Sequence, residues 1–155
     1  MCALEIPLVI QDKIFVGPDI AIADPTWAAV TTAKSQTVGS LWYPHVYEKN
    51  RWRFTGNVLM PDPSCIPEMF GDTMLVTGTV FPVADVEARR YRIRLLNACQ
   101  ARFLNLQLTN GLPNMLTAPA ERWDLLVDFS GLAGQSVILY NDAPSPFPMG
   151  TAVND

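Results

Sequence analysis

The sequence predicts an all-β fold, with a Greek-key sandwich or barrel as the favoured architecture. Thirteen prolines and nine glycines are spread along 155 residues and leave no room for long helices. Between them lie roughly six to eight short apolar runs, separated by turn signals about every ten residues. The length fits a single core, so we expect one domain over residues 1–155, with a long irregular excursion at 17–50 and a tail at 149–155.

The N-terminal half supplies two predicted strand pairs. The run EIPLVIQDKIFV reads as a strand or strand pair, with Pro7 tolerated at a sheet edge and Gln11–Lys13 turning the chain. The run TMLVTGTVFP predicts a hairpin that turns at Thr77 and Gly78. A β-branched residue disfavours the positive φ of a tight hairpin turn, so a longer or bulged turn stays open.

The C-terminal half supplies strands whose side chains alternate between a core face and an outer face. In RRYRIRLLNA the core face holds Tyr91, Ile93 and Leu95, and the outer face holds Arg90, Arg92 and Arg94. In ARFLNLQL the leucines share one face. In ERWDLLVDF the core face holds Trp123, Leu125, Val127 and Phe129, and SVILYND follows as the last strand.

Two carboxylates, Asp124 and Asp128, lie two strand steps apart on the outer face of their strand. An acid–base pair needs a desolvated cleft that raises one pKa. Arginines in a neighbouring strand would lower both pKa values instead. We therefore interpret the two aspartates as cross-strand ion-pair partners of Arg90, Arg92 and Arg94 that help to set the register.

Composition excludes several classes of function. The net charge of −4 and the pI near 4.9 have the wrong sign for binding a phosphate backbone, so no nucleic-acid partner is expected. No apolar run approaches the roughly 18 residues of a membrane helix, and the start MCALEIPLVI lacks the basic region of a signal peptide. We expect a soluble chain whose native compartment is open. The GLAGQ segment joins two strands rather than opening a helix, so it is no phosphate cradle.

The sequence offers few side chains that could bind a metal ion or act as an activated nucleophile. His45 is the only histidine, and no GxSxG motif surrounds a serine. A blue copper site needs two histidines and one cysteine. The cysteines have no CxxC spacing, form at most one bridge, and read as buried thiols at Cys65 and Cys99; the third is Cys2. His45 sits in an aromatic cluster that either packs a loop or stacks on a ring-shaped ligand: Trp42, Tyr43, Tyr47 and Trp52.

Four segments, taken in order, are similar to one known family. They are EIPLVIQDK, GDTMLVTGTVFP, YRIRLLNACQARFLNLQL and APAERWDLLVDFSGLAGQSVILYN. Together they resemble the middle, cupredoxin-like domain of bacterial three-domain multicopper oxidases, in the branch of spore-coat laccase, bilirubin oxidase and phenoxazinone synthase. The match leaves out residues 17–50 and the stretch after Pro148. The resemblance implies a Greek-key, cupredoxin-like β-barrel or sandwich.

The resemblance also implies a function. The parent enzymes oxidise phenols, bilirubin-like pigments or metal ions and reduce dioxygen to water. Their copper ligands lie in the first and third domains, as His-x-His pairs and a His-Cys-His run, and this sequence contains neither motif. The middle domain holds the outer two apart. We therefore expect a non-catalytic, copper-free scaffold, with no catalytic, cofactor-binding or metal-binding residue in this chain.

Two alternatives to the scaffold stay open. One is a copper-dependent oxidase of phenolic substrates that is active only on assembly with other domains or copies, drawing on His45 and a cysteine. The other is a small-molecule or protein binding module that uses the aromatic cluster. The expected partners are flanking cupredoxin domains or a second copy of the chain, bound through exposed apolar patches.

The chain departs from the family pattern in two places. TNGLPNML stands where relatives usually carry a long segment rich in glycine and aspartate, so this loop is shortened. Thr77 stands where relatives usually have an asparagine in the hairpin turn. With the start at Met1, the shortened loop suggests a domain excised or engineered to stand alone, or a natural truncation.

Overall fold

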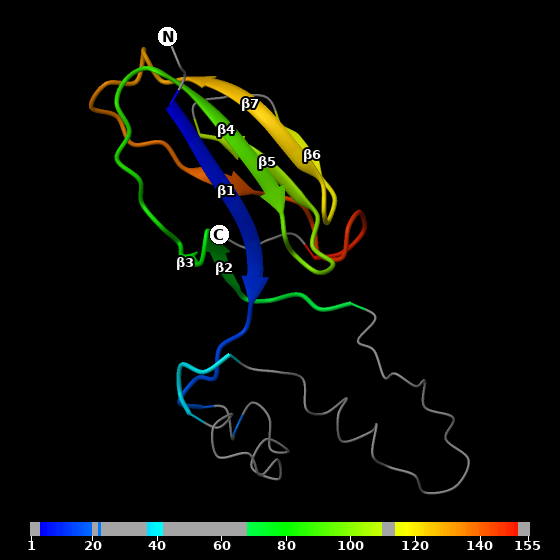
Figure 1. Ribbon diagram of the computed structural model, residues 1–155. Coiled ribbons are helices and arrows are strands. Elements are labelled where there is room, and N and C mark those ends of the chain that lie inside the picture. Colours follow the sequence, from blue (N-terminus) through cyan, green and yellow to red (C-terminus); the bar gives the residue numbers. More distant parts are fainter. Residues whose placement is uncertain (1–3, 20–21, 23–36, 42–67, 110–113, 152–155) are drawn as a thin grey trace, which may run out of the picture. The chain divides into compact units, whose positions relative to one another are not determined.

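The described part of the chain is built from β-strands. The computed structural model describes residues 4–19, 22, 37–41, 68–109 and 114–151. All eight elements named within these ranges are strands, which confirms the predicted number of short strands. They are β1 Leu4–Lys13, β2 Thr73–Val76, β3 Thr79–Val80, β4 Arg90–Asn97, β5 Leu104–Leu108, β6 Met115–Thr117, β7 Arg122–Asp128 and β8 Leu139–Asn141 (Figure 1).

The strands form two sheets. The first has the order β3-β2-β1-β4-β7 and the second the order β6-β5-β8. β1 pairs with β4 in parallel, and β4 pairs with β7 in antiparallel orientation, so three strands distant in sequence run side by side (Figure 1). A parallel pair needs a crossover connection, so consecutive hairpins alone cannot build this sheet.

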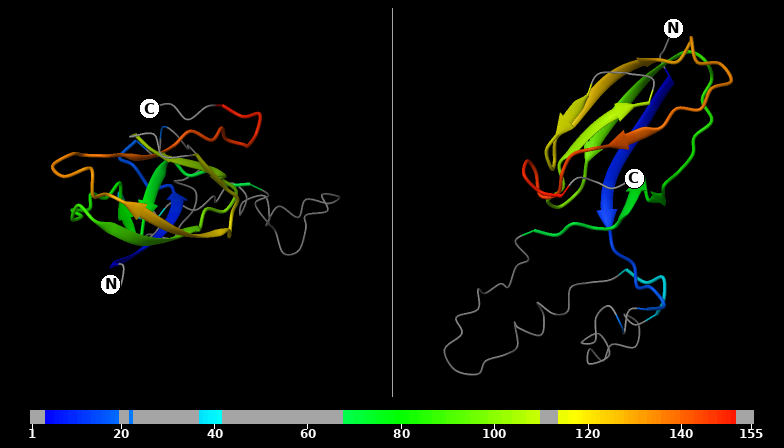
Figure 2. Two further views of the ribbon diagram at one scale, coloured as in Figure 1. Left: turned by 90° about the horizontal axis from the view of Figure 1, so that it is seen from above. Right: turned by 180° about the vertical axis from the view of Figure 1, so that it is seen from behind.

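The contacts divide the chain into two compact units. The strand unit comprises Met1–Asp12 and Met74–Asp155, and the second unit comprises Lys13–Thr73. The views of Figure 2 show the two sheets of the strand unit as separate layers. In the second unit, Phe15 bridges to Leu41, and the backbone of Val16 bonds to Ser40 and Gly39. The expectation of one domain over residues 1–155 stays a prediction, and most of the 17–50 excursion lies outside the described residues.

The core of the strand unit is filled from both sheets. Its buried cluster joins Ile10 of β1 and Leu95 of β4 to Leu104 and Leu106 of β5, together with Cys99. Met74, Val76 and Met115 pack against this cluster. The alternation predicted for the arginine-bearing strand is confirmed, because Tyr91 and Leu95 are buried while the arginines between them are exposed.

β1 differs from its sequence-based prediction in one respect. The predicted turn at Gln11–Lys13 is wrong, because β1 runs through these residues to Lys13. The polar sequence resembled a turn, but Asp12 is only 5% exposed and pairs with Arg102 at 3.1 Å. Asp12 is therefore held in the strand by Arg102, which lies 90 residues away, although its local sequence is typical of a turn.

Pro7 lies in an interior strand, since β1 stands between β2 and β4. A proline lacks the N–H that a sheet ladder uses, and this is why an edge position was predicted. The carbonyl of Pro7 faces the hairpin, where it accepts a hydrogen bond from the Thr77 hydroxyl at 3.2 Å. In a strand the N–H of a residue points to the same side as its carbonyl. The missing donor of Pro7 therefore falls beside the turn, where no strand backbone requires it.

The Thr77–Gly78 hairpin is confirmed and is tight. Val76 pairs with Thr79, so only two residues form the turn, and both have positive φ, 51° for Thr77 and 84° for Gly78. The longer or bulged turn left open by the sequence does not form. Besides its bond to Pro7, the Thr77 hydroxyl accepts a bond from the Val9 N–H at 3.4 Å, and the Thr77 N–H donates to the Val9 carbonyl at 2.8 Å. Thr77 thus extends the ladder to β1 with its side chain.

No helix in the part of the chain that the structure describes is both long and apolar enough to span a membrane.

Candidate functional site

The charged face of β4 and β7 is an ion-pair ladder, as predicted, but its pairing is shifted. Arg90 lies directly opposite Asp128 and bonds to it at 2.8 Å. Arg94 lies opposite Asp124, yet Asp124 is bound instead by the guanidinium of Arg92, from Nε at 2.9 Å and Nη2 at 2.5 Å. Arg94 turns the other way and pairs with Glu5 of β1. The ladder therefore ties three strands together rather than two.

The electrostatics of this ladder do not suit acid–base catalysis. The hydrogen bond from Arg90, supported by the N–H and hydroxyl of Ser130, lowers the pKa of Asp128 to about 2. The hydrogen bond from Arg92 likewise lowers the pKa of Asp124. Both carboxylates stay ionised near neutral pH, and both are exposed to solvent. The interpretation of Asp124 and Asp128 as cross-strand ion-pair partners of the arginines is confirmed. Because their pKa values are lowered, neither carboxylate is protonated near neutral pH, as a general acid must be.

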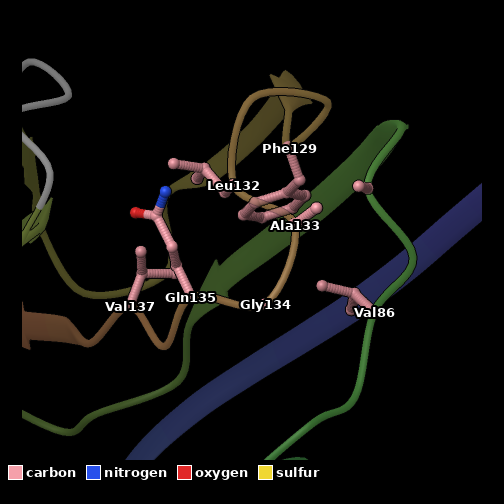
Figure 3. Close-up of a pocket in the computed structure, with 8 residues that line it drawn as sticks. Val86, Phe129, Leu132, Ala133, Gly134, Gln135 and Val137 are labelled. Atoms are coloured by element: carbon pink, nitrogen blue, oxygen red, sulfur yellow. The ribbon is translucent and has the colours of Figure 1, made fainter.

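A hollow lined mostly by apolar side chains lies beside Phe129, where β7 ends. It has a volume of about 220 Å³ and is bounded by Val86 on one side and by the β7–β8 connection on the other (Figure 3). Successive turns shape this connection, with the Leu132 N–H bonding to the Phe129 carbonyl and the Gln135 N–H to that of Leu132. Gln135 supplies the single polar side chain of the lining. The hollow is therefore lined mostly by apolar side chains and offers no side-chain acid, base or nucleophile.

One lining residue of the hollow, Phe129, packs against a second aromatic ring. Tyr91 of β4 meets Phe129 edge to face, with 5.9 Å between ring centroids. The Tyr91 hydroxyl accepts a hydrogen bond from the Glu87 N–H at 2.9 Å and so holds the segment before β4 against the sheet. Edge-to-face pairs contribute about 1 kcal/mol beyond their buried area. Sequence analysis placed both rings on the core face, and the structure confirms this.

Cys99 is a buried free thiol, as the sequence suggested. It is 6% exposed, and its Sγ lies 3.9 Å from the Ile10 carbonyl. Burial, together with the negative charge of Asp12, raises the pKa of the thiol to about 12. A thiol of this kind stays protonated at neutral pH, whereas metal ligation and nucleophilic attack both require the thiolate.

Asn97 is a buried residue whose role the sequence did not reveal. Its side chain is fully enclosed and donates to the carbonyls of Arg102 and Thr117, each at 3.0 Å. Its side-chain oxygen accepts from the Cys99 N–H at 3.0 Å. One asparagine thus joins the end of β4, the loop before β5 and the end of β6. Its odd position in the alternating strand, on the same face as Tyr91 and Leu95, was the one signal of its burial in the sequence.

The residues best suited to copper lie outside the described part of the chain. These are His45, Cys2 and Cys65, and the proposed aromatic cluster lies there too: Trp42, Tyr43, Tyr47 and Trp52. Among the described residues, no group of three or more His, Cys, Asp or Glu side chains could hold a metal ion. Copper prefers imidazole and thiolate ligands. With Cys99 buried and protonated, the described donors do not fit copper.

The chain is similar in sequence to part of several laccases and multicopper oxidases, although no protein-family profile matches it. It is 37% identical over 123 residues to the laccase of Bacillus subtilis, a match that covers 68% of this chain and 23% of the laccase. It is 32% identical to the laccase of Bacillus stratosphericus, over 90% of this chain and 26% of that protein. It is 39% identical to multicopper oxidase LPR1 homolog 3 of Oryza sativa, over 64% and 22%. The chain thus spans about a quarter of the length of these relatives.

Comparison with solved structures gives the same assignment. The 2F4 variant of the multicopper oxidase McoA from Aquifex aeolicus superposes with a TM-score of 0.63 at 29% identity, covering 98% of this chain and 30% of McoA. McoA itself superposes with a TM-score of 0.60 at 27% identity. The resemblance drawn from four sequence segments and the cupredoxin-like, all-β fold are both confirmed. In sequence and in fold, the chain therefore matches a single cupredoxin-like domain of the laccase-like multicopper oxidases.

Proposed function

We propose that this domain is a copper-free scaffold within a laccase-like multicopper oxidase, in the middle position between two flanking cupredoxin-like domains. The observation that carries the proposal is the shortage of copper donors. The whole sequence contains one histidine, and the one cysteine that the structure describes is buried with a pKa of about 12. A blue site alone needs two imidazoles and a thiolate.

The described surface supports a scaffold role rather than chemistry. Its carboxylates on β7 are held ionised by arginines, and the side chains that line the hollow beside Phe129 include no acid, base or nucleophile. Large apolar side chains are exposed on the segment before β4, with Phe81 at 67% and Val83 at 92%. Exposed apolar side chains on a domain that is a quarter of its relatives' length suit contact with neighbouring domains.

A copper titration of the purified chain tests whether it binds copper on its own. We expect Cu(II) to give no intense visible absorption and no oxygen consumption with a phenolic dye. His45→Ala is the matched control, because any weak copper binding that it removes comes from the lone imidazole. A stoichiometric blue colour with oxygen uptake would overturn the copper-free proposal.

A chimera tests the scaffold role directly. The matched 123-residue stretch of the Bacillus subtilis laccase is replaced by the corresponding residues of this chain. A folded chimera that keeps its copper content and oxidase activity supports the scaffold. A folded chimera that loses copper shows instead that this stretch of the laccase provides ligands.

The relatives' names favour a second candidate, a copper-dependent oxidase formed only on assembly, with this domain contributing to a shared site. In that case copper binding appears when the flanking domains are present and falls with His45→Ala. Under the scaffold proposal, His45→Ala leaves the copper content of the chimera unchanged.

A further inference from the structure

β7 is the longest strand that lies at an edge of either described sheet. The first sheet ends in β3 and β7, and the second ends in β6 and β8. β3 has two residues and β6 and β8 have three each, whereas β7 has seven. Natural proteins usually shorten an exposed edge or block it with lysine or proline. The sequence of β7, RWDLLVD, contains neither residue.

The backbone of β7 presents four residues outward. The Asn97 N–H bonds to the Glu121 carbonyl and the Phe129 N–H to the Arg89 carbonyl, so odd-numbered residues of this strand face β4. Even-numbered residues therefore direct their N–H and carbonyl groups away from the sheet. Among the described strands, β7 pairs only with β4, so these groups at Arg122, Asp124, Leu126 and Asp128 have no strand partner.

The side chains of β7 are complementary to a second copy of the same strand. A twofold axis through Leu125, the middle residue, pairs two antiparallel copies over their whole length. Arg122 then lies opposite Asp128 of the other copy, twice. Among the described residues Arg122 forms no ion pair; its Nη1 donates to the Ala120 carbonyl at 3.1 Å.

The same register also covers apolar side chains. Leu126, which is 75% exposed, becomes a diagonal neighbour of its own copy. Trp123, which is 40% exposed, comes to lie opposite Val127. Aromatic and β-branched residues form favourable cross-strand pairs.

The neighbouring register is excluded by charge. An axis through Leu126 places Asp124 opposite Asp128 twice, and like charges directly opposite are destabilising. The register about Leu125 therefore places opposite charges, Arg122 and Asp128, across from each other.

We propose that the edge of β7 binds β7 of a second copy of this chain in antiparallel register about Leu125, which joins two five-stranded sheets into one. The interface does not depend on whether the domain is catalytic, so it stands apart from the scaffold proposal. It is small, and we expect a weak dimer with a dissociation constant on the order of 10 µM to 1 mM.

Sedimentation equilibrium of the full chain over this concentration range tests the association. We expect the molar mass to rise toward that of a dimer. Leu126→Asp places a carboxylate beside Asp124 of the other copy and should weaken the dimer at least tenfold. Within one copy the new carboxylate lies opposite Arg92, so the fold is retained. Val83→Asp is the matched control, since Val83 is 92% exposed and lies outside β7.

Amide hydrogen exchange tests the register. As the concentration rises, protection should increase at the even residues 122–128, while Trp123, Leu125 and Val127 remain protected throughout by β4. The proposal is overturned by a monomer at every concentration. It is also overturned by a dimer that leaves these even-numbered amides unprotected, or by a Leu126→Asp variant that dimerises as the parent does.

Discussion

Replacing Thr77 by valine separates the two opposing effects at the hairpin turn. Thr77 has a φ of 51°, in the left-handed region that costs a β-branched residue about 1–2 kcal/mol. Valine has the same shape and so keeps this cost. It lacks the hydroxyl that joins Thr77 to Pro7 and Val9 of β1 at 3.2 and 3.4 Å.

The magnitude follows from the geometry of these two bonds. Both are long and exposed, so each contributes about 0.5 kcal/mol, the low end of the usual range. Thr77→Val should therefore lower the free energy of unfolding by about 1 kcal/mol. With a urea dependence of about 2 kcal/mol per molar, the unfolding midpoint falls by about 0.5 M.

Thr77→Ser is the matched comparison. Serine keeps the hydroxyl and loses the β-branch, so its urea midpoint should equal or slightly exceed that of the parent chain. Urea unfolding followed by far-ultraviolet circular dichroism and by tryptophan fluorescence measures both variants. A valine variant as stable as the parent would refute the hydrogen-bond argument, as would a serine variant that loses as much as valine does.

Three further predictions concern buried and charged groups. Asn97→Asp puts a carboxylate against the Arg102 and Thr117 carbonyls in a fully enclosed place, so unfolding free energy should fall by about 3 kcal/mol or more at pH 7; because the pKa of the new acid is raised by folding, the deficit should shrink as pH falls toward about 4. Folding lowers the pKa of Asp128 to about 2, so its contribution to stability is complete above about pH 4 and is lost as pH falls toward 2. In Asp128→Asn, the urea midpoint should therefore depend less on pH between pH 4 and pH 2 than in the parent chain, and the two chains should show the same pH dependence above pH 5. The Cys99 thiol should resist iodoacetamide at pH 8 in the folded chain and react readily in urea, as peptide mass spectrometry can show, because its pKa is about 12.

Alternation predicted the strands well because it reports a local property. The strict period of two in β4 and β7 gave their faces, the arginine row and the aspartates that meet it. The same reasoning could not predict that Arg94 pairs with Glu5, because nothing local reveals that β1 lies parallel to β4. Nor could it place Asp12, whose burial depends on Arg102, far along the chain. Long-range partners are the part of this fold that composition and period leave open.

The expectation that this chain holds no copper site stays a prediction, and it depends on residue types that can be counted in the sequence. A single histidine is visible in the sequence, and so is the lack of a His-x-His pair. The protonation of Cys99 is not visible, because it depends on burial and on the nearby charge of Asp12. The hollow beside Phe129 is equally nonlocal, since Val86 and the β7–β8 connection meet only in the folded chain.

The ion-pair ladder and the open edge of β7 are properties of the same residues. Side-chain direction and backbone direction both alternate with period two in a strand, so the even residues carry the charged side chains and also the outward N–H groups. In the joined sheet, the charged faces of the two copies would therefore be continuous, with the even residues of both strands at hydrogen-bonded positions. The odd residues would meet at non-hydrogen-bonded positions, where side chains approach more closely, and this is where Trp123 and Val127 lie. A single edge contact would thus extend both the ionic network and the apolar core, and on the charged face both Arg122→Glu, opposite Asp128, and Leu126→Asp, opposite Asp124, should weaken it.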